Sequence, residues 1–200
     1  NTWKDEYLGV NATINNTEGG AATKASDGIE FHGAWAEWPV GGQGENQLYH
    51  FANYNFTLVA TVSIDGVPKG DTPIPLMGVK LNDEGKSKLM ELSYEKGKKW
   101  ILQCSDGRSS EKLSNSWKSK TQYQVAIVLR NGTQATVYVD GKSVGEAPCQ
   151  LENTDSKGIS HFFIGGDGGS TNNKRSQKGV PVTVRNVLLY NRPLSSEEIN

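Results

Sequence analysis

The 200-residue sequence has little net charge, little cysteine and no long apolar run, and each shortage limits the classes of function that the protein can have. Its 21 basic and 22 acidic side chains leave a formal net charge of −1, which argues against the clustered basic surface of a nucleic-acid-binding protein. Its longest aliphatic run, residues 125–129, is far shorter than the roughly 18 apolar residues that a membrane span requires. We therefore expect one soluble domain over residues 1–200, with no nucleic-acid partner.

Signals for cellular targeting are lacking as well. The chain begins with Asn1 instead of methionine, and it contains neither an apolar signal segment nor a C-terminal lipidation pattern. We interpret it as a fragment of a longer protein.

Residue patterns typical of catalytic and metal sites are not evident. Residues 141–145 spell G-x-S-x-G around Ser143, but that nucleophile motif needs a helix after it, and this segment follows a predicted hairpin strand. The histidines, His32, His50 and His161, are far apart and have no cysteine or carboxylate at ligand spacing. We therefore expect no catalytic residues, no metal and no cofactor, and we expect that this chain is not an enzyme.

Two cysteines, Cys104 and Cys149, are present. Cys149 follows Pro148 in an apparent loop and Cys104 ends an apolar run, so the two do not have the spacing of a metal-binding pair. A disulfide between them is the favoured interpretation, and two buried free thiols are the alternative.

Four glycosylation acceptor sequences of the form Asn-x-Ser/Thr occur, at Asn11, Asn15, Asn55 and Asn131. Chance alone gives about two in a chain this rich in Asn, Ser and Thr, so the excess is weak support for secretion. The sequence favours an extracellular location on this ground.

Short β-branched, aromatic and aliphatic runs recur between Gly, Pro, Asn and Asp. Every second residue of segment 56–64 is apolar, which predicts a strand with one buried face. Further strands are predicted over residues 76–81, 89–94, 99–104, 159–164 and 182–190. So many strands without crossover helices predict an all-β fold, a two-sheet antiparallel sandwich.

Two turn sequences organise residues 123–144. Asn131-Gly132 lies between two apolar runs and predicts a β-hairpin, and Asp140-Gly141 then predicts a second turn. Near the end of the chain, Ser195 and Glu198 have the spacing of a capping box and predict a short C-terminal helix.

Four aromatic or imidazole side chains, Phe31, His32, Trp35 and Trp38, lie within eight residues. Indole faces pack well on the apolar faces of sugar rings, so Trp35 and Trp38 are a candidate glycan platform. Packing of these rings in the core is the alternative, and it is the favoured one.

Three segments carry a family resemblance. They are residues 125–129 with 137–141, VAIVL and VYVDG; residues 159–166, ISHFFIGG; and residues 182–192, VTVRNVLLYNR. Together they resemble the concanavalin A-like, or laminin-G-like, lectin fold, a jelly roll. More narrowly, residues 182–192 resemble the subterminal motif of the trypanosomal sialidase/trans-sialidase superfamily, departing from it at Leu188, where that motif often has Phe. Similarity at residues 6–12, 38–40 and 46–51 extends the resemblance over nearly the whole chain.

The resemblance implies a parent protein with a sialidase-like β-propeller domain ahead of residue 1, held at the extracellular face of the cell by a lipid anchor. None of the propeller's catalytic residues can be carried onto a position of this chain. The two cysteines and residues 72–78, TPIPLMG, look more like the non-enzymatic surface-glycoprotein branch, the adhesins. In that branch the subterminal motif is implicated in attachment to host proteins of the laminin or cytokeratin type, and so in host-cell invasion and virulence.

Strand alternation limits what the motif can present to such a partner. In a regular strand, Val182, Val184, Leu188 and Tyr190 share one face, and Thr183, Arg185, Val187 and Leu189 share the other. One of these faces belongs to the core, so only the other face and the turn at residues 191–193 are free for a partner. The candidate host-binding residues are Val182, Thr183, Val184, Asn186, Val187, Leu188, Leu189, Tyr190, Asn191 and Arg192.

The resulting expectation is a non-catalytic, lectin-like adhesion domain of a parasite surface glycoprotein, with a host-cell, matrix or cytoskeletal protein and its own propeller as partners. One alternative is the C-terminal domain of an active exo-α-sialidase or trans-sialidase. The other is a carbohydrate-binding lectin module that uses Trp35 or Trp38.

Overall fold

The computed structural model describes residues 2–3, 12–24, 28–39, 55–70, 73–81, 88–104, 109–112, 116–150, 159–165 and 180–199. These residues are almost entirely extended, as the sequence predicts. The strands are β1 (Thr2–Trp3), β2 (Ala12–Lys24), β3 (Gly28–Pro39), β4 (Phe56–Ile64), β5 (Ile74–Leu81), β6 (Lys88–Tyr94), β7 (Trp100–Cys104), β8 (Ser109–Lys112), β9 (Gln122–Arg130), β10 (Gln134–Val139), β11 (Lys142–Gln150), β12 (Ile159–Ile164) and β13 (Val182–Tyr190). One short helix, α2 (Ser196–Ile199), follows them.

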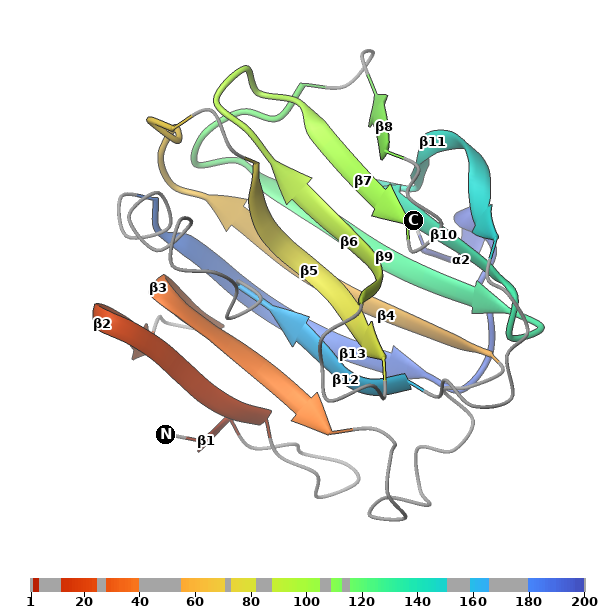
Figure 1. Ribbon diagram of the computed structural model, residues 1–200, viewed down its shortest axis with the longest axis horizontal. Coiled ribbons are helices and arrows are strands. Elements are labelled where there is room, and N and C mark those ends of the chain that lie inside the picture. The colour runs from red at the N-terminus through yellow and green to blue at the C-terminus, as the bar shows by residue number, and fades with distance from the viewer. Residues whose placement is uncertain are drawn as a thin grey trace.

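The strands stack as two antiparallel layers (Figure 1). Hydrogen bonds connect them in the order β11-β10-β9-β4-β13-β3-β12-β5-β6-β7-β8. The first layer contains β4, β9, β10, β11 and β13, and the second contains β5, β6, β7, β8 and β12. Strand β3 belongs to both, because its residues 28–31 pair with β13 and its residues 36–39 pair with β12. The predicted two-sheet sandwich is confirmed.

The hydrophobic core lies between the layers. The apolar face predicted for β4 is confirmed, since Phe56, Leu58, Ala60, Val62 and Ile64 all belong to the main core cluster. Aromatic contacts then join one layer to the other. The rings of Phe56 in β4 and Phe162 in β12 are 4.8 Å apart between centroids, and the ring of Trp100 in β7 meets Tyr123 in β9 edge to face at 5.4 Å.

The prediction that β4 has only one buried face is wrong, because its outer face is buried as well. Val59 packs with Ala126 and Val128 of β9 beneath Leu194 and Ile199. The C-terminal segment, residues 192–199, therefore covers part of the first layer and turns one end of that layer into a second, smaller core. The sequence of β4 alone predicts a half-buried strand, because the residues that cover its outer face lie some 135 positions later in the chain.

Both predicted turns are confirmed by their backbone conformation. Asn131 and Gly132 have φ angles of 54° and 70°, and Asp140 and Gly141 have φ angles of 49° and 77°. Positive φ at both central residues matches the twist of the strands that the turn joins. The first turn is closed by the Thr133 amide, which donates to the Arg130 carbonyl at 3.2 Å.

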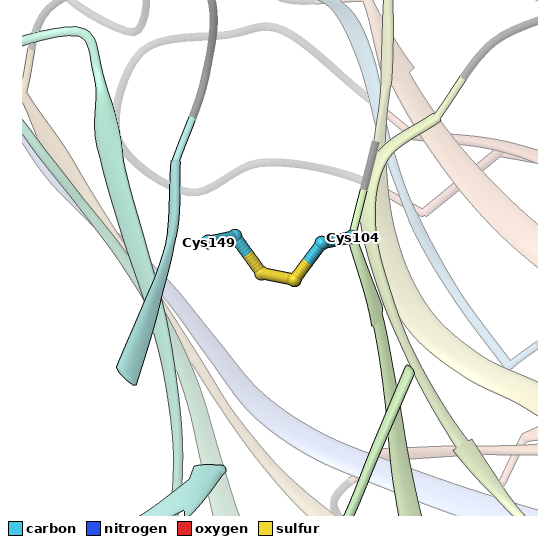
Figure 2. The surroundings of a disulfide bond; sticks show 2 residues. All are labelled: Cys104 and Cys149. Carbon is cyan, nitrogen blue, oxygen red and sulfur yellow. A yellow bond between two sulfur atoms is a disulfide. The ribbon is translucent and has the colours of Figure 1, made fainter. Parts of the chain in front are cut away.

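A disulfide joins the two layers (Figure 2). Cys104 at the end of β7 and Cys149 in β11 are bonded, with 5.6 Å between their Cα atoms. The disulfide favoured by the sequence is therefore present. Strand β11 also contacts β7 and β8, so the two ends of the strand order meet at this side of the sandwich while β3 connects the layers elsewhere. On the chain-entropy argument, closing a loop of 45 residues stabilises the fold by about 4 kcal/mol.

No helix within the described part of the chain has the length and apolar character needed to cross a membrane.

Candidate functional site

The subterminal motif, residues 182–192, lies in strand β13 and the turn after it. Its first half sits in the middle of the first layer, paired with β3 on one side and with β4 on the other. Val182, Thr183 and Val184 are buried there, and Val184 has no exposed surface at all. These three residues are buried in the sandwich and present almost no surface to a partner.

Thr183 is held by a carboxylate at the end of β4. Its hydroxyl donates to Asp65 Oδ2 at 2.8 Å, and the Ser63 hydroxyl donates to Asp65 Oδ1 at 2.8 Å. The Asp65 amide in turn donates to the Pro181 carbonyl at 2.8 Å. Asp65 thus ties the start of β13 to β4, and the polar character of Thr183 is explained by this bond.

A β-bulge divides β13 at Asn186. Arg185 lies opposite Thr61 and Leu188 lies opposite Val59, so two residues of β13 face the single residue Ala60 of β4. Asn186 adopts a φ of 51°, a left-handed conformation that Asn tolerates better than most residues. The extra residue shifts the alternation of side chains between the two faces by one position.

Because of the bulge, the side chains of β13 are not divided between its two faces as the sequence predicts. Val182 and Val184 point into the core, as one of the two expected faces requires, but beyond the bulge Val187 and Leu189 pack against the core. Leu188 and Tyr190 are exposed instead. The regular alternation predicted for residues 182–190 is therefore wrong from Asn186 onward. An Asn within a β-branched run was the available signal, since Asn is depleted in strands.

Leu188 and Tyr190 form what we call the exposed pair. Their relative exposures are 49% and 38%, and among the described residues only Val67, at 43%, is another exposed large hydrophobic residue. The neighbours of the exposed pair on β4 are Val59 and Thr57, both buried under the C-terminal segment. The exposed pair therefore borders that segment on the outer face of the first layer.

The last motif residue, Arg192, is bound to its own chain. Its carbonyl accepts a hydrogen bond from the Thr57 hydroxyl at 2.8 Å, and its Nη1 lies 2.6 Å from Glu198 Oε2. Glu198 also completes the predicted capping box, because Ser195 and Glu198 exchange side-chain to main-chain hydrogen bonds at 3.2 Å. Hydrogen bonding to Arg192 and to the Ser195 amide lowers the pKa of the Glu198 carboxyl below its ordinary value.

The remaining motif side chain, Asn191, is exposed in the turn after β13. Of the ten candidate host-binding residues, the structure therefore exposes Asn186, Leu188, Tyr190, Asn191 and Arg192. The other five are buried or pack against the core.

The two tryptophans of the candidate glycan platform lie on opposite faces of β3. Trp38 packs against the main core cluster. The Trp35 indole points the other way, where its Nε1 donates to Glu37 Oε1 at 3.1 Å, and the same oxygen accepts a hydrogen bond from Lys80 Nζ. The structure does not bring Trp35 and Trp38 together on one surface.

The four glycosylation acceptor sequences, or sequons, differ in their structural surroundings. Asn11 lies outside the described residues, and Asn15 lies in β2 with only its own main chain described. Asn55 and Asn131 meet, because the Asn131 amide donates to Asn55 Oδ1 at 3.0 Å. Asn131 is exposed and Asn55 is half-buried.

The serine of the G-x-S-x-G sequence lies within a hairpin. Ser143 is in β11, opposite Tyr138 of β10, so the strand-turn-helix geometry of a nucleophile elbow is not formed there. Among the residues that the structure describes, no three His, Cys, Asp or Glu side chains gather in a way that could hold a metal ion.

Comparison with known proteins identifies relatives of this chain. The family described as trans-sialidase, C-terminal domain, matches residues 1–197. Sialidase 85-1.1 of Trypanosoma cruzi is 38% identical over 204 residues, which cover 98% of this chain and 26% of that protein. The chain thus spans about a quarter of the length of this relative.

Solved structures agree with this match. Trypanosoma rangeli sialidase superposes with a TM-score of 0.82 at 38% identity, covering 99% of this chain and 30% of that one. The receptor-binding domain of botulinum neurotoxin C/D mosaic serotype superposes with a TM-score of 0.62 over all of this chain and 49% of that one, but at 14% identity it shares the fold alone. The motif, the two-layer sandwich and these matches lead to one conclusion: the chain belongs to the trans-sialidase C-terminal domain family.

Proposed function

We propose that this domain is a non-catalytic adhesion module that binds a host-cell or matrix protein through the exposed pair, Leu188 and Tyr190. The observation that carries the proposal is the bulge at Asn186, which places these two large side chains on the outer face of the first layer. Tyrosine is enriched among the residues that contribute most to protein–protein binding, and aliphatic neighbours exclude water around it.

The main chain of the same segment supports a protein partner. Within the described part of the chain, β3 pairs with residues 182–185 of β13 and no strand pairs with residues 186–190 on that side. Unpaired amides and carbonyls at a strand edge are a common way to recognise an extended peptide. Side-chain contacts at the exposed pair and main-chain pairing at this edge would act on the same partner.

The setting of the module in its parent protein belongs to the same proposal. The parent carries a sialidase-like propeller ahead of residue 1, which is a partner of this domain, and it is held at the extracellular face of the cell by a lipid anchor. Support comes from the family, from relatives several times longer than this chain, and from the disulfide, which suits an oxidising compartment.

A second candidate function is the C-terminal domain of an active sialidase or trans-sialidase. The names of the relatives favour it, since Sialidase 85-1.1 and Sialidase 85-1.3 of Trypanosoma cruzi are 38% and 36% identical to this chain. In that case the parent acts on sialic acid at its propeller, and this domain supports the propeller. Hydrolysis of a sialoside by the full-length parent, abolished by removal of its propeller, would establish this function.

Cell binding tests the adhesion module directly. The 200-residue chain should bind mammalian cells, and binding should persist after mild periodate, which destroys most sugar diols and largely spares protein. The Leu188→Ser, Tyr190→Ser double variant should lose most of this binding. Val67→Ser is the matched control, since it removes an exposed aliphatic side chain elsewhere and should bind normally.

Two outcomes would overturn the proposal. Equal binding by the double variant and by Val67→Ser would show that the exposed pair does not contact the partner. Loss of binding after periodate treatment would instead indicate a glycan ligand.

A further inference from the structure

Two glycosylation acceptor sequences meet at one end of the sandwich. Asn55 precedes β4, and Asn131 follows β9 in the turn toward β10, which Figure 1 shows near the start of β4. The two residues are in contact through the hydrogen bond from the Asn131 amide to Asn55 Oδ1. The fold explains the two acceptor sequences to different extents.

Every residue of Asn55-Phe56-Thr57 has a structural role. Phe56 is in the core, and the Asn55 side chain supports the turn at Asn131. Thr57 has no exposed surface, and its hydroxyl both donates to the Arg192 carbonyl and accepts from the Leu194 amide, each at 2.8 Å. This Asn-x-Thr pattern therefore has a structural explanation that does not depend on a glycan.

Only part of Asn131-Gly132-Thr133 is explained in this way. Asn131 and Gly132 supply the two positive φ angles of the turn. Thr133 contributes its main-chain amide to closing the turn, a bond that any residue except proline can make. Its hydroxyl makes no hydrogen bond among the described residues, so the fold does not call for Thr or Ser at this position.

The position of Asn131 suits a bulky modification. Its side chain is exposed at a turn that joins two strands of the first layer, and N-linked glycans occur on such surface loops. Two backbone amides of the turn already have partners, since the Asn131 amide donates to Asn55 and the Thr133 amide donates to Arg130. Attachment at the side-chain nitrogen would disturb neither bond.

We propose that Asn131 carries an N-linked glycan. The donor is an oligosaccharide linked through diphosphate to a lipid. The bond between the first sugar carbon and the diphosphate oxygen breaks, a bond forms from that carbon to Asn131 Nδ2, and the amide gives up one proton as the lipid diphosphate leaves. The hydroxyl of Thr133 provides the second half of the recognition sequence.

Site mapping on secreted protein tests the proposal. The chain is produced through the secretory pathway of a eukaryotic cell and digested, and its peptides are treated with peptide N-glycosidase F in heavy-oxygen water. The peptide containing Asn131 should appear as aspartate carrying heavy oxygen. A sample incubated in the same heavy-oxygen water without the enzyme is needed, because Asn-Gly sequences also deamidate spontaneously and would take up heavy oxygen during the incubation.

Two variants provide the matched comparison. Thr133→Ala should lose one glycan mass from the intact protein, and Thr133→Ser, which preserves the recognition sequence, should retain it. Both leave the Asn131-Gly132 turn unchanged. Recovery of the Asn131 peptide from the original chain as unmodified asparagine would overturn the proposal, whatever the state of the other three sequons.

Discussion

The hydroxyl of Thr57 in β4 and the carbonyl of Arg192 at the end of the motif are hydrogen-bonded at 2.8 Å across 135 residues of sequence. The same hydroxyl accepts a hydrogen bond from the Leu194 amide at 2.8 Å. Arg130 contributes a third bond, from Nη2 to the Leu194 carbonyl at 2.9 Å. Side chains of the first layer thus hold the main chain of the C-terminal segment and place Leu194 and Ile199 over Val59.

Replacing Thr57 should therefore lower the free energy of unfolding more than the small size of a threonine side chain suggests. In Thr57→Val, the shape is kept but the buried Leu194 amide and the Arg192 carbonyl each lose their partner, at a cost of about 2–4 kcal/mol in the free energy of unfolding. Thr57→Ser keeps the hydroxyl and is the control. Urea denaturation of unglycosylated protein with its disulfide formed measures the difference. Equal stabilities for the two variants would show that the hydroxyl does not hold the segment.

The bond between Asp65 and Thr183 should be visible as an energetic coupling. A hydrogen bond to a charged group is worth about 1.5–3 kcal/mol, so a double-mutant cycle of Asp65→Ala and Thr183→Val should give a coupling of that size. Thr136→Val in β10, two strands away from β4, serves as the uncoupled partner and should be additive with Asp65→Ala within about 0.5 kcal/mol. Additivity of the Asp65 and Thr183 changes would contradict this interpretation.

Local patterns in the sequence were sufficient to predict most of the elements. The strand over residues 56–64 with its apolar face, the turns at Asn131 and Asp140, and the capping box at Ser195 follow from a few neighbouring residues, and all are present in the structure. The disulfide was favoured by similar local arguments. The features that could not be predicted depend on contacts between residues far apart in the sequence, above all the packing of residues 192–199 on the outer face of β4.

The candidate site shows why alternation alone was not enough. A single added residue at Asn186 exchanges the faces of everything after it, so Leu188 and Tyr190 become exposed where regular alternation places them with Val182 and Val184. A bulge of this kind is fixed by the pairing partner, here residues 57–62 of β4, and pairing is not visible in the sequence of one strand.

The bulge itself can be tested through the backbone of Asn186. At a φ of 51°, a β-branched residue is strained, so Asn186→Val should lower the free energy of unfolding by about 1–2 kcal/mol. Asn186→Gly is free of that strain and should remain within about 0.5 kcal/mol of the original. Because the Asn186 side chain is exposed, lost packing does not complicate the comparison. Thermal unfolding of the two variants tests this prediction, and equal unfolding midpoints would show that residue 186 does not need a left-handed backbone conformation.

Arg192 differs from the exposed pair in being tied to the helix that follows it. Its guanidinium lowers the pKa of Glu198, so Arg192→Gln should raise that pKa toward the ordinary value for a glutamate, about 4.3, and Arg192→Lys should raise it less. A carboxyl with a lowered pKa in the folded state contributes stability that is present above its unfolded pKa and is lost as the pH falls through the folded value. The contribution of this pair should therefore be full at neutral pH and disappear on acidification below about pH 4.3. Carbon-detected NMR titration of the Glu198 carboxyl measures the shift directly. The same pKa in Arg192→Gln and in the original protein would mean that the ion pair is not formed in solution, and that Arg192 is as free to meet a partner as Tyr190.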